Sequence, residues 1–340
     1  GLNPRSFNVT WLNEKYDEIY NFSEGMAVVR RFYSYGIIDT TGKEVLPVIY
    51  DSVSSFNDGL ARVKKGVNYI YIDKTGKEVM PIVYKSMGQF SEGLAVVEKG
   101  NEYNNATDFG YVDKTGKEVI PTIYDSASDF EDGIARVKKD GKYGLIDKNG
   151  NEISLFLYDY IHPFSEGIAR VVEYMGFNRR EVFGFIDSKG NEIVAPIYNR
   201  AEDFKDGFAR VYAFDESGNG FYGFVDKTGK QITPLIYDEA GNFNEGLARV
   251  GKYVGRSQYA YGFIDETGKE VIPLTYQKVG DFKDGVAWVS NGSHSGLIDK
   301  TGKLVLPMHY RQVRESSEGL IAVENGCDFG FADNTGEIVI

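Results

Sequence analysis

One carboxylate position recurs nine times in the sequence, each time directly before a glycine. Hard cations such as Ca²⁺ prefer clustered oxygen ligands, so a ladder of these side chains could bind metal ions. Each carboxylate could instead accept hydrogen bonds within its own turn, and we favour this interpretation and expect no metal site. The nine residues are Glu24, Asp58, Glu92, Asp132, Glu166, Asp206, Glu245, Asp284 and Glu318.

Five arginines share another recurring position, and three histidines are scattered through the chain. The arginines could form a stripe that holds an acidic ligand, but pairing with the recurrent carboxylates is the simpler expectation. The histidines have no Ser, Cys or metal-ligand partner at a spacing typical of catalysis or metal binding. The residues are Arg62, Arg136, Arg170, Arg210 and Arg249, and His162, His294 and His309.

The remaining patterns of enzyme chemistry are missing from the sequence. The glycines follow the repeat rather than a phosphate-binding loop or a nucleophile elbow, and Cys327 is the only cysteine. A catalytic site would need a unique set of residues that breaks the repeat, and we find none. We therefore expect no enzymatic activity and no cofactor.

The acidic-Gly pair defines nine copies of one unit, numbered one to nine along the chain. Successive copies are 34 to 40 residues apart. A second marker, usually an aromatic residue before Gly, precedes the next acidic-Gly by 23 residues in every interval, so all length variation lies in one connection. A fixed segment beside one variable loop indicates that the segment packs against its neighbours and the loop projects.

Each copy has the pattern of a β meander. In copy four, Ile134–Val137 alternates with period two, and Tyr143–Asp147 forms a second strand. Asp147 and Gly150 then indicate a tight turn in which Gly takes a positive φ. A third strand follows and is expected to end at a proline, such as Pro121 in copy three, because proline has no N–H to donate.

A unit of about 34 residues is too small to hold a core alone, so neighbouring copies must share one. We predict an all-β fold in which nine tandem repeats form an open, superhelical, solenoid-like array, with a β-propeller as the alternative. Residues 1–15 form a lead-in or cap, and residues 16–340 form a single repeat domain. Copy nine departs from the pattern at Ser316, Ile321 and Ala332, which fits a terminal cap.

The pattern F-x-E/D-G-x-A-x-V followed by aromatic-G-F-I-D-x-x-G-x-E-V-I-P-x-x-Y-D resembles the WG (KWG) repeat of bacterial proteins, with Tyr or Phe where that family often has Trp. The resemblance covers roughly residues 16–340. It implies a bacterial, often surface-exposed or multidomain protein, so it slightly favours an extracellular or cell-surface location. It implies no catalytic residues, because the motif is structural.

The chain carries 50 acidic and 38 basic residues, a net charge of −12. This charge repels phosphate backbones and anionic lipids, so we expect no nucleic-acid partner. No apolar run approaches the length of a membrane-spanning segment, so we expect no membrane insertion.

The variable connection is longer in copies three, five, six and seven, at Asn101–Asp108, Tyr174–Val182, Phe214–Gly220 and Lys252–Ala260. Insertions at one position of a stacked unit emerge on one side, which is often the binding face. Aromatic residues and arginine, which are enriched at interface hot spots, gather there. The candidate partner-binding residues are Tyr174, Phe177, Arg179, Arg180, Phe214, Tyr253, Arg256 and Tyr259.

These features predict a non-catalytic repeat scaffold that binds a protein or glycan partner, of acidic or sugar character, along copies five to seven. The alternative is a structural spacer or stalk within a larger bacterial surface or secreted protein. A spacer has no reason to lengthen one connection in only some copies, which favours binding. An enzyme is the least favoured class.

Overall fold

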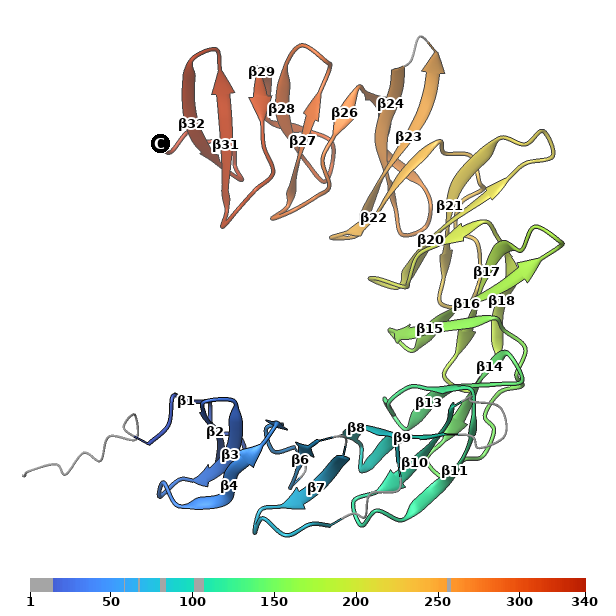
Figure 1. Cartoon of the computed structure of the whole chain (residues 1–340). Coiled ribbons are helices and arrows are strands. Elements are labelled where there is room, and N and C mark those ends of the chain that lie inside the picture. The colour runs from blue at the N-terminus through green and yellow to red at the C-terminus, as the bar shows by residue number, and fades with distance from the viewer. Residues whose placement is uncertain (1–14, 58, 67, 80–83, 101–106, 256–257) are drawn as a thin grey trace, which may run out of the picture. The chain divides into compact units, whose positions relative to one another are not determined.

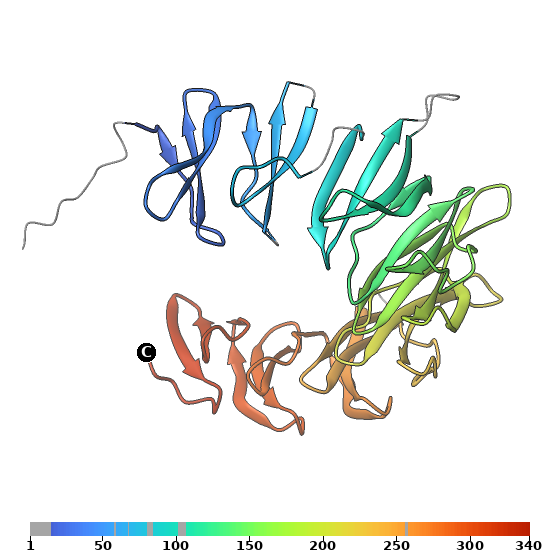
Figure 2. The ribbon, with the colours of Figure 1, turned by 90° about the horizontal axis from the view of Figure 1, so that it is seen from below.

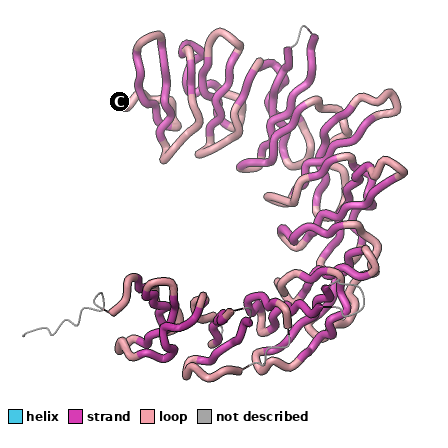
Figure 3. The backbone as a smooth tube through the Cα atoms, in the orientation of Figure 1, coloured by secondary structure: helices cyan, strands magenta, loops and turns pink. Residues whose placement is uncertain are grey.

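The computed structural model describes residues 15–57, 59–66, 68–79, 84–100, 107–255 and 258–340. These residues contain strands, turns and loops and no helix (Figure 3). A membrane-spanning helix is accordingly not found among them. The chain divides into two compact units, residues 1–157 and 158–340, each of which is described by itself.

The first unit holds copies one to four as four small antiparallel sheets, which follow one another in chain order (Figures 1 and 2). Their strands are β1 (Glu18–Ile19), β2 (Met26–Arg31), β3 (Ser34–Asp39) and β4 (Glu44–Tyr50); β5 (Ser52–Val53), β6 (Leu60–Lys65) and β7 (Asn68–Asp73); β8 (Ser86–Ser91), β9 (Leu94–Gly100), β10 (Thr107–Asp113) and β11 (Glu118–Tyr124); and β12 (Ser126–Ala127), β13 (Ile134–Lys139) and β14 (Lys142–Asp147).

The second unit holds copies five to nine as five sheets of the same kind. Their strands are β15 (Tyr160–Ser165), β16 (Ile168–Met175), β17 (Arg180–Asp187) and β18 (Glu192–Tyr198); β19 (Arg200–Ala201), β20 (Phe208–Phe214) and β21 (Gly220–Asp226); β22 (Glu239–Asn244), β23 (Leu247–Gly255), β24 (Gln258–Asp265) and β25 (Glu270–Tyr276); β26 (Lys278–Val279), β27 (Val286–Ser290), β28 (Ser295–Asp299) and β29 (Leu304–Tyr310); and β30 (Gln312–Val313), β31 (Leu320–Asn325) and β32 (Asp328–Asp333).

The core lies between consecutive sheets. At the junction of copies one and two, Ile37 and Leu46 of the first sheet are buried against Phe56, Ala61 and Val63 of the second. The equivalent core of copies six and seven has Phe224 and Tyr237 packed against Phe243, Ala248 and Val250. The predicted all-β tandem array, with cores shared by neighbours, is confirmed in each unit by itself.

Two glycine turns set the path of each meander. Glu24 and Gly25 both have positive φ, 51° and 83°, and Ser23 and Met26 exchange two backbone hydrogen bonds around them, which is the type I′ hairpin geometry. At the second turn, the Asp39 carboxylate accepts from the backbone N–H of Thr41 at 2.8 Å. A further bond from the Thr41 hydroxyl lowers the pKa of Asp39. The predicted Asp-x-x-Gly turn is confirmed.

The glycine after the aromatic residue is required by the strand that crosses it. A Cβ on Gly36 would lie 2.7 Å from the carbonyl oxygen of Leu46, and one on Gly262 would lie 2.3 Å from that of Ile272. This close approach occurs where the last strand bulges, so that Leu46 pairs with Ile37 while Tyr50 pairs with Tyr35.

The expectation that proline ends the third strand is wrong in four copies. Pro47 lies inside β4, and Pro121, Pro273 and Pro307 lie inside β11, β25 and β29. Each of these is an edge strand of its sheet, and the proline falls in the bulged stretch between two paired positions. A missing N–H is tolerated at such a site, so the strand continues.

At the two ends of the chain, apolar side chains are buried to different extents. Residues 1–14 of the predicted lead-in lie outside the described residues, but Tyr16 is buried against Ala27, Val29 and Ile38 of copy one. Copy nine, by contrast, leaves Phe331 and Ile340 exposed. The prediction that copy nine forms a terminal cap stays a prediction.

Candidate functional site

The recurrent carboxylates connect neighbouring copies. Glu24 accepts a hydrogen bond from the backbone N–H of Gly59 at 3.0 Å, so it caps the acidic-Gly turn of the next copy rather than its own. It also pairs with Lys74 of that copy at 3.0 Å. Glu92, Glu166 and Glu245 make the same two contacts, with Gly133 and Lys148, Gly207 and Lys227, and Gly285 and Lys300.

This clamp alternates along the chain because glutamate stands in odd copies and aspartate in even ones. The hydrogen bond with Lys148 holds the pKa of Glu92 below its usual value. Asp58 lies outside the described residues. In the parts of the chain that the structure describes, no three acidic, His or Cys side chains come close enough to hold a metal ion.

The arginines of the shared strand position also act between copies. Arg62 donates to the carbonyl oxygen of Met87 in the next copy at 2.7 Å. Arg170 and Arg210 make the equivalent bonds to Ala201 and Ala240. Their carboxylate partners are not those before glycine: Arg170 pairs with Asp203 at 3.3 Å, Arg249 with Asp281 at 2.8 Å, and Arg210 with Glu202.

Aromatic rings cover several of these arginines. The guanidinium of Arg170 lies 5.6 Å from the ring centre of Phe183, and that of Arg210 lies 5.4 Å from the ring centre of Tyr222. His162 lies beside Arg170, with 3.2 Å between its Nδ1 and an Arg170 nitrogen. Because these arginines already bond to the next copy, few of their N–H groups remain to bind an acidic ligand.

The lengthened connections are extensions of the β hairpin. In copy five, Tyr174 pairs with Glu181 and Met175 with Arg180 across β16 and β17. In copy seven, Tyr253 pairs with Tyr259 across β23 and β24. The backbone N–H groups of Tyr174 and Tyr253 donate to Asp159 and Asp238 at 2.8 and 2.7 Å, and that of Phe214 donates to Asn199 at 3.2 Å. Tyr174, Arg180, Phe214, Tyr253 and Tyr259 thus lie on paired strands, whereas Phe177 and Arg179 lie in the turn between β16 and β17.

Copies five and six bring four of the candidate residues together. The Arg179 guanidinium lies 4.7 Å from the ring centre of Tyr174, and that of Arg180 lies 5.2 Å from the ring centre of Phe214 in the next copy. Tyr212 packs edge-on against Phe214 at 5.4 Å. We call this cluster the tip surface; it comprises Tyr174, Phe177, Arg179, Arg180, Tyr212 and Phe214.

The other candidate residues are placed as follows. Phe177 is fully exposed at the hairpin end of copy five. Tyr253 and Tyr259 contact each other at 5.6 Å in copy seven. Arg256 lies outside the described residues, as does the 101–106 part of the lengthened connection in copy three. The tip surface is mixed in charge, because exposed Glu181, Asp215 and Glu216 accompany the arginines.

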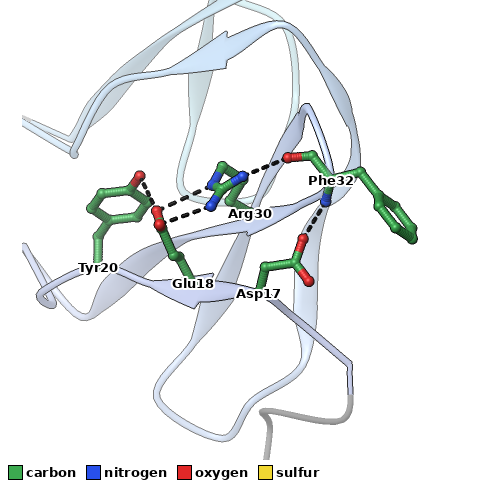
Figure 4. A network of polar contacts seen from close by, with 5 residues as sticks. All are labelled: Asp17, Glu18, Tyr20, Arg30 and Phe32. Carbon is green, nitrogen blue, oxygen red and sulfur yellow. Dashed lines mark hydrogen bonds and ion pairs between the residues drawn. The ribbon is translucent and has the colours of Figure 1, made fainter.

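Sequence reasoning missed an exposed aromatic tip in copy one (Figure 4). Arg30 holds Glu18 through bonds of 3.1 and 2.8 Å, which lowers the pKa of Glu18 to about 2. Arg30 also donates to the carbonyl of Phe32 at 2.6 Å, and Asp17 accepts from the Phe32 N–H. Phe32 stands 15 residues after Asp17, as Tyr174 stands 15 after Asp159. That shared spacing could have identified it.

No curated protein matches the chain. The solved structures that resemble it include a eukaryotic initiation factor, 11% identical over 94% of this chain and 96% of that one with a TM-score of 0.39. Another is the β-propeller domain of the Trilobed protease from Pyrococcus furiosus, 9% identical over 92% and 96% with a TM-score of 0.31. Similarity this distant does not bear on function.

The family model described as WG containing repeat matches nine stretches that together span most of the chain. They are residues 15–31, 35–69, 71–103, 109–143, 143–173, 183–212, 222–253, 261–293 and 296–326. Each stretch includes the acidic-Gly turn or the strands beside it, whose geometry is described above. The chain therefore belongs to the WG containing repeat family.

Proposed function

We propose that the protein is a non-catalytic scaffold whose tip surface, on copies five and six, binds a protein partner. The observation that carries the proposal is the contact between Arg180 of copy five and Phe214 of copy six. It joins two lengthened hairpins into one continuous surface of aromatic rings and guanidinium groups.

The composition of the tip surface favours a protein over a glycan. Sugars stack on open ring faces, whereas Tyr174 and Phe214 each already have a guanidinium within stacking distance. Tyr and Arg are the residue types most enriched at protein hot spots. The mixed charges around them suit a partner that carries both acidic and basic groups, because opposite charges on the two proteins can then pair.

The ordered backbone supports the same proposal. Because Tyr174 and Phe214 lie on or at the end of paired strands, few side-chain and loop motions would be lost on binding. The junction arginines and carboxylates are already bonded between copies, so the surface that remains for a partner is at the hairpin ends. Copy seven, with Tyr253 and Tyr259, would extend it.

The test is affinity capture from the native organism with the full chain as bait, followed by measurement of the dissociation constant. Combined Tyr174→Ala, Arg180→Ala and Phe214→Ala should weaken binding at least about a hundredfold, as hot-spot losses do. The matched control is Phe32→Ala with Tyr33→Ala, which removes the exposed aromatic tip of copy one. A glycan-array signal that the triple variant loses, without any protein captured, would replace the protein partner with a sugar.

A further inference from the structure

The junction of copies three and four lacks an arginine that most other junctions have. In copies two, five and six, the arginine of the shared strand position donates to a carbonyl oxygen of the next copy and lies over the aromatic ring that precedes glycine. In copies five and seven it pairs with an aspartate of the next copy. Copy three has Val96 at this position, so no guanidinium group from this strand enters the junction.

The groups that surround an arginine elsewhere are nevertheless present around Val96. Phe109 holds the position of the aromatic ring, and Ala127 of copy four holds the position whose carbonyl oxygen accepts from arginine in other copies. Asp129 of copy four holds the position of the pairing aspartate. Phe109 and Ala127 both pack, half-buried, against the core of this junction. We call these four residues, together with Gly88, the copy-three slot.

Gly88 leaves space in the copy-three slot. A Cβ on Gly88 would meet nothing closer than 3.7 Å, where it would reach Oδ1 of Asp129. At the equivalent Gly241, a Cβ would lie 2.6 Å from Nε of Arg249, because the arginine occupies that space. In copy eight the side chain of Trp288 occupies it. The copy-three slot therefore has room for a planar cation beside its carboxylate.

The charge around the copy-three slot is negative. The Asp129 carboxylate has no hydrogen-bond or ion-pair partner among the described residues, and its side chain reaches the surface. Desolvation by burial, and then the nearby charge of Glu131, raise the pKa of Asp129. Glu98, which pairs with Phe109 across the sheet, adds a carboxylate that Lys85 contacts at 3.1 Å. A guanidinium group could neutralise Asp129 and bond to it through two N–H groups.

We propose that the copy-three slot binds the guanidinium group of an arginine side chain from a partner protein. The ring of Phe109 would cover one face of the guanidinium, and the Asp129 carboxylate and the Ala127 carbonyl oxygen would accept its N–H groups. A partner's side chain fits better than free arginine, because free arginine carries an α-carboxylate that the acidic slot repels. This site is separate from the tip surface of copies five and six and does not depend on it.

Amide NMR of the full chain tests the proposal with small probes. Acetyl-arginine amide should produce saturable shifts of the Gly88, Val96 and Asp129 amides, with a dissociation constant on the order of 1 mM, because a single partly exposed ion pair is weak. Acetyl-lysine amide should bind several-fold more weakly, since it lacks the planar donors. Free arginine should also bind more weakly than the amide. Equal binding of the two forms of arginine would overturn the partner side chain as the source.

Two variants and one matched control locate the binding site. Val96→Arg supplies a guanidinium group from within the chain and should abolish the shifts, and Asp129→Asn should weaken binding by about fivefold through loss of the ion pair. Arg249→Val opens the equivalent slot of copy seven and should create a second site, with new shifts at Gly241 and Asp281 that the wild type lacks. Absence of saturable shifts in the wild type, or shifts that survive Val96→Arg, would contradict the proposal.

Discussion

Hairpin tips and junctions between copies are built from the same residue types, aromatic rings and arginine, but they differ in what covers them. At the junctions, Arg62 and Arg170 are half-buried and donate to carbonyls of the next copy. At the tips, Arg179 and Arg180 are exposed, and their guanidinium groups lie against aromatic rings of their own or the neighbouring hairpin. The junction groups are committed to the fold, whereas the tip groups retain hydrogen-bonding capacity for a partner.

Two junctions between copies differ at one residue that decides whether an ion pair forms. Those of copies three and four and of copies seven and eight share the aromatic pair, with ring centres 4.8 Å apart in both, and the glutamate clamp. Asp281 has Arg249 as its partner, but in copy three the position equivalent to Arg249 is occupied by Val96, so the equivalent Asp129 meets no arginine from that position. Burial accordingly raises the pKa of Asp129. A junction therefore tolerates loss of its ion pair while its apolar core is kept.

The largest effect on stability is expected at the buried aromatic ring. Phe130→Ala, which opens the junction of copies three and four, should lower the free energy of unfolding of that region by about 3–5 kcal/mol. Phe22→Ala is the matched control, because the equivalent ring in copy one is 53% exposed. Denaturant unfolding followed by hydrogen exchange measures both. Equal losses in the two variants would show that the shared core is not what holds the copies together.

A smaller loss of stability is expected when the junction of copies seven and eight is made to resemble the junction of copies three and four. Arg249→Val removes the partner of Asp281 and the packing of the arginine stem, and should cost about 1 kcal/mol because both side chains are partly exposed. Arg249→Lys keeps the positive charge but not the planar guanidinium, so its stability should lie between those of the wild type and Arg249→Val. The same denaturant titration reads out the series, and a neutral Arg249→Val would contradict the role of the arginine.

The converse change should stabilise the first junction in a pH-dependent manner. Val96→Arg can be accommodated because Gly88 provides the space that Gly241 provides beside Arg249. Burial raises the pKa of Asp129 in the wild type, so this group's contribution to folding stability falls as pH rises through the raised pKa. An arginine at position 96 would lower the pKa of Asp129, and the contribution to stability would then rise with pH. The gain from Val96→Arg should be about 0.5–1 kcal/mol at pH 7 and vanish near pH 3.

The carboxylate clamp should contribute least among the junction contacts. Glu92→Gln keeps an acceptor for the Gly133 N–H but loses the ion pair with Lys148, and should cost about 0.5 kcal/mol. Glu318→Gln in the same chain is the control. Glu318 has no hydrogen-bond or ion-pair partner within the described structure, so this change should be neutral. High salt should reduce the difference between the variants.

The sequence predicted the meander, both glycine turns and the shared core because each depends on local spacing. It did not predict that Glu24 caps the turn of the next copy, since a carboxylate before glycine looks the same whichever turn it caps. Nor did it predict that β4 runs past Pro47, because edge position and bulge depend on pairing. Tip residues such as Tyr174 and Phe214 were identifiable as insertions, but the contact of Arg180 with Phe214 needed the stacking of two copies.

The most direct test of the separation between junction and tip is to shorten the extended hairpins. Replacing the tips of copies five, six and seven with the Asp140–Gly141 turn of copy four leaves every junction residue in place. The thermal midpoint should stay within about 2 °C of wild type, as expected for surface changes, while affinity for the captured partner is lost. Retained affinity, or collapse of the fold, would contradict the assignment of binding to the tips and stability to the junctions.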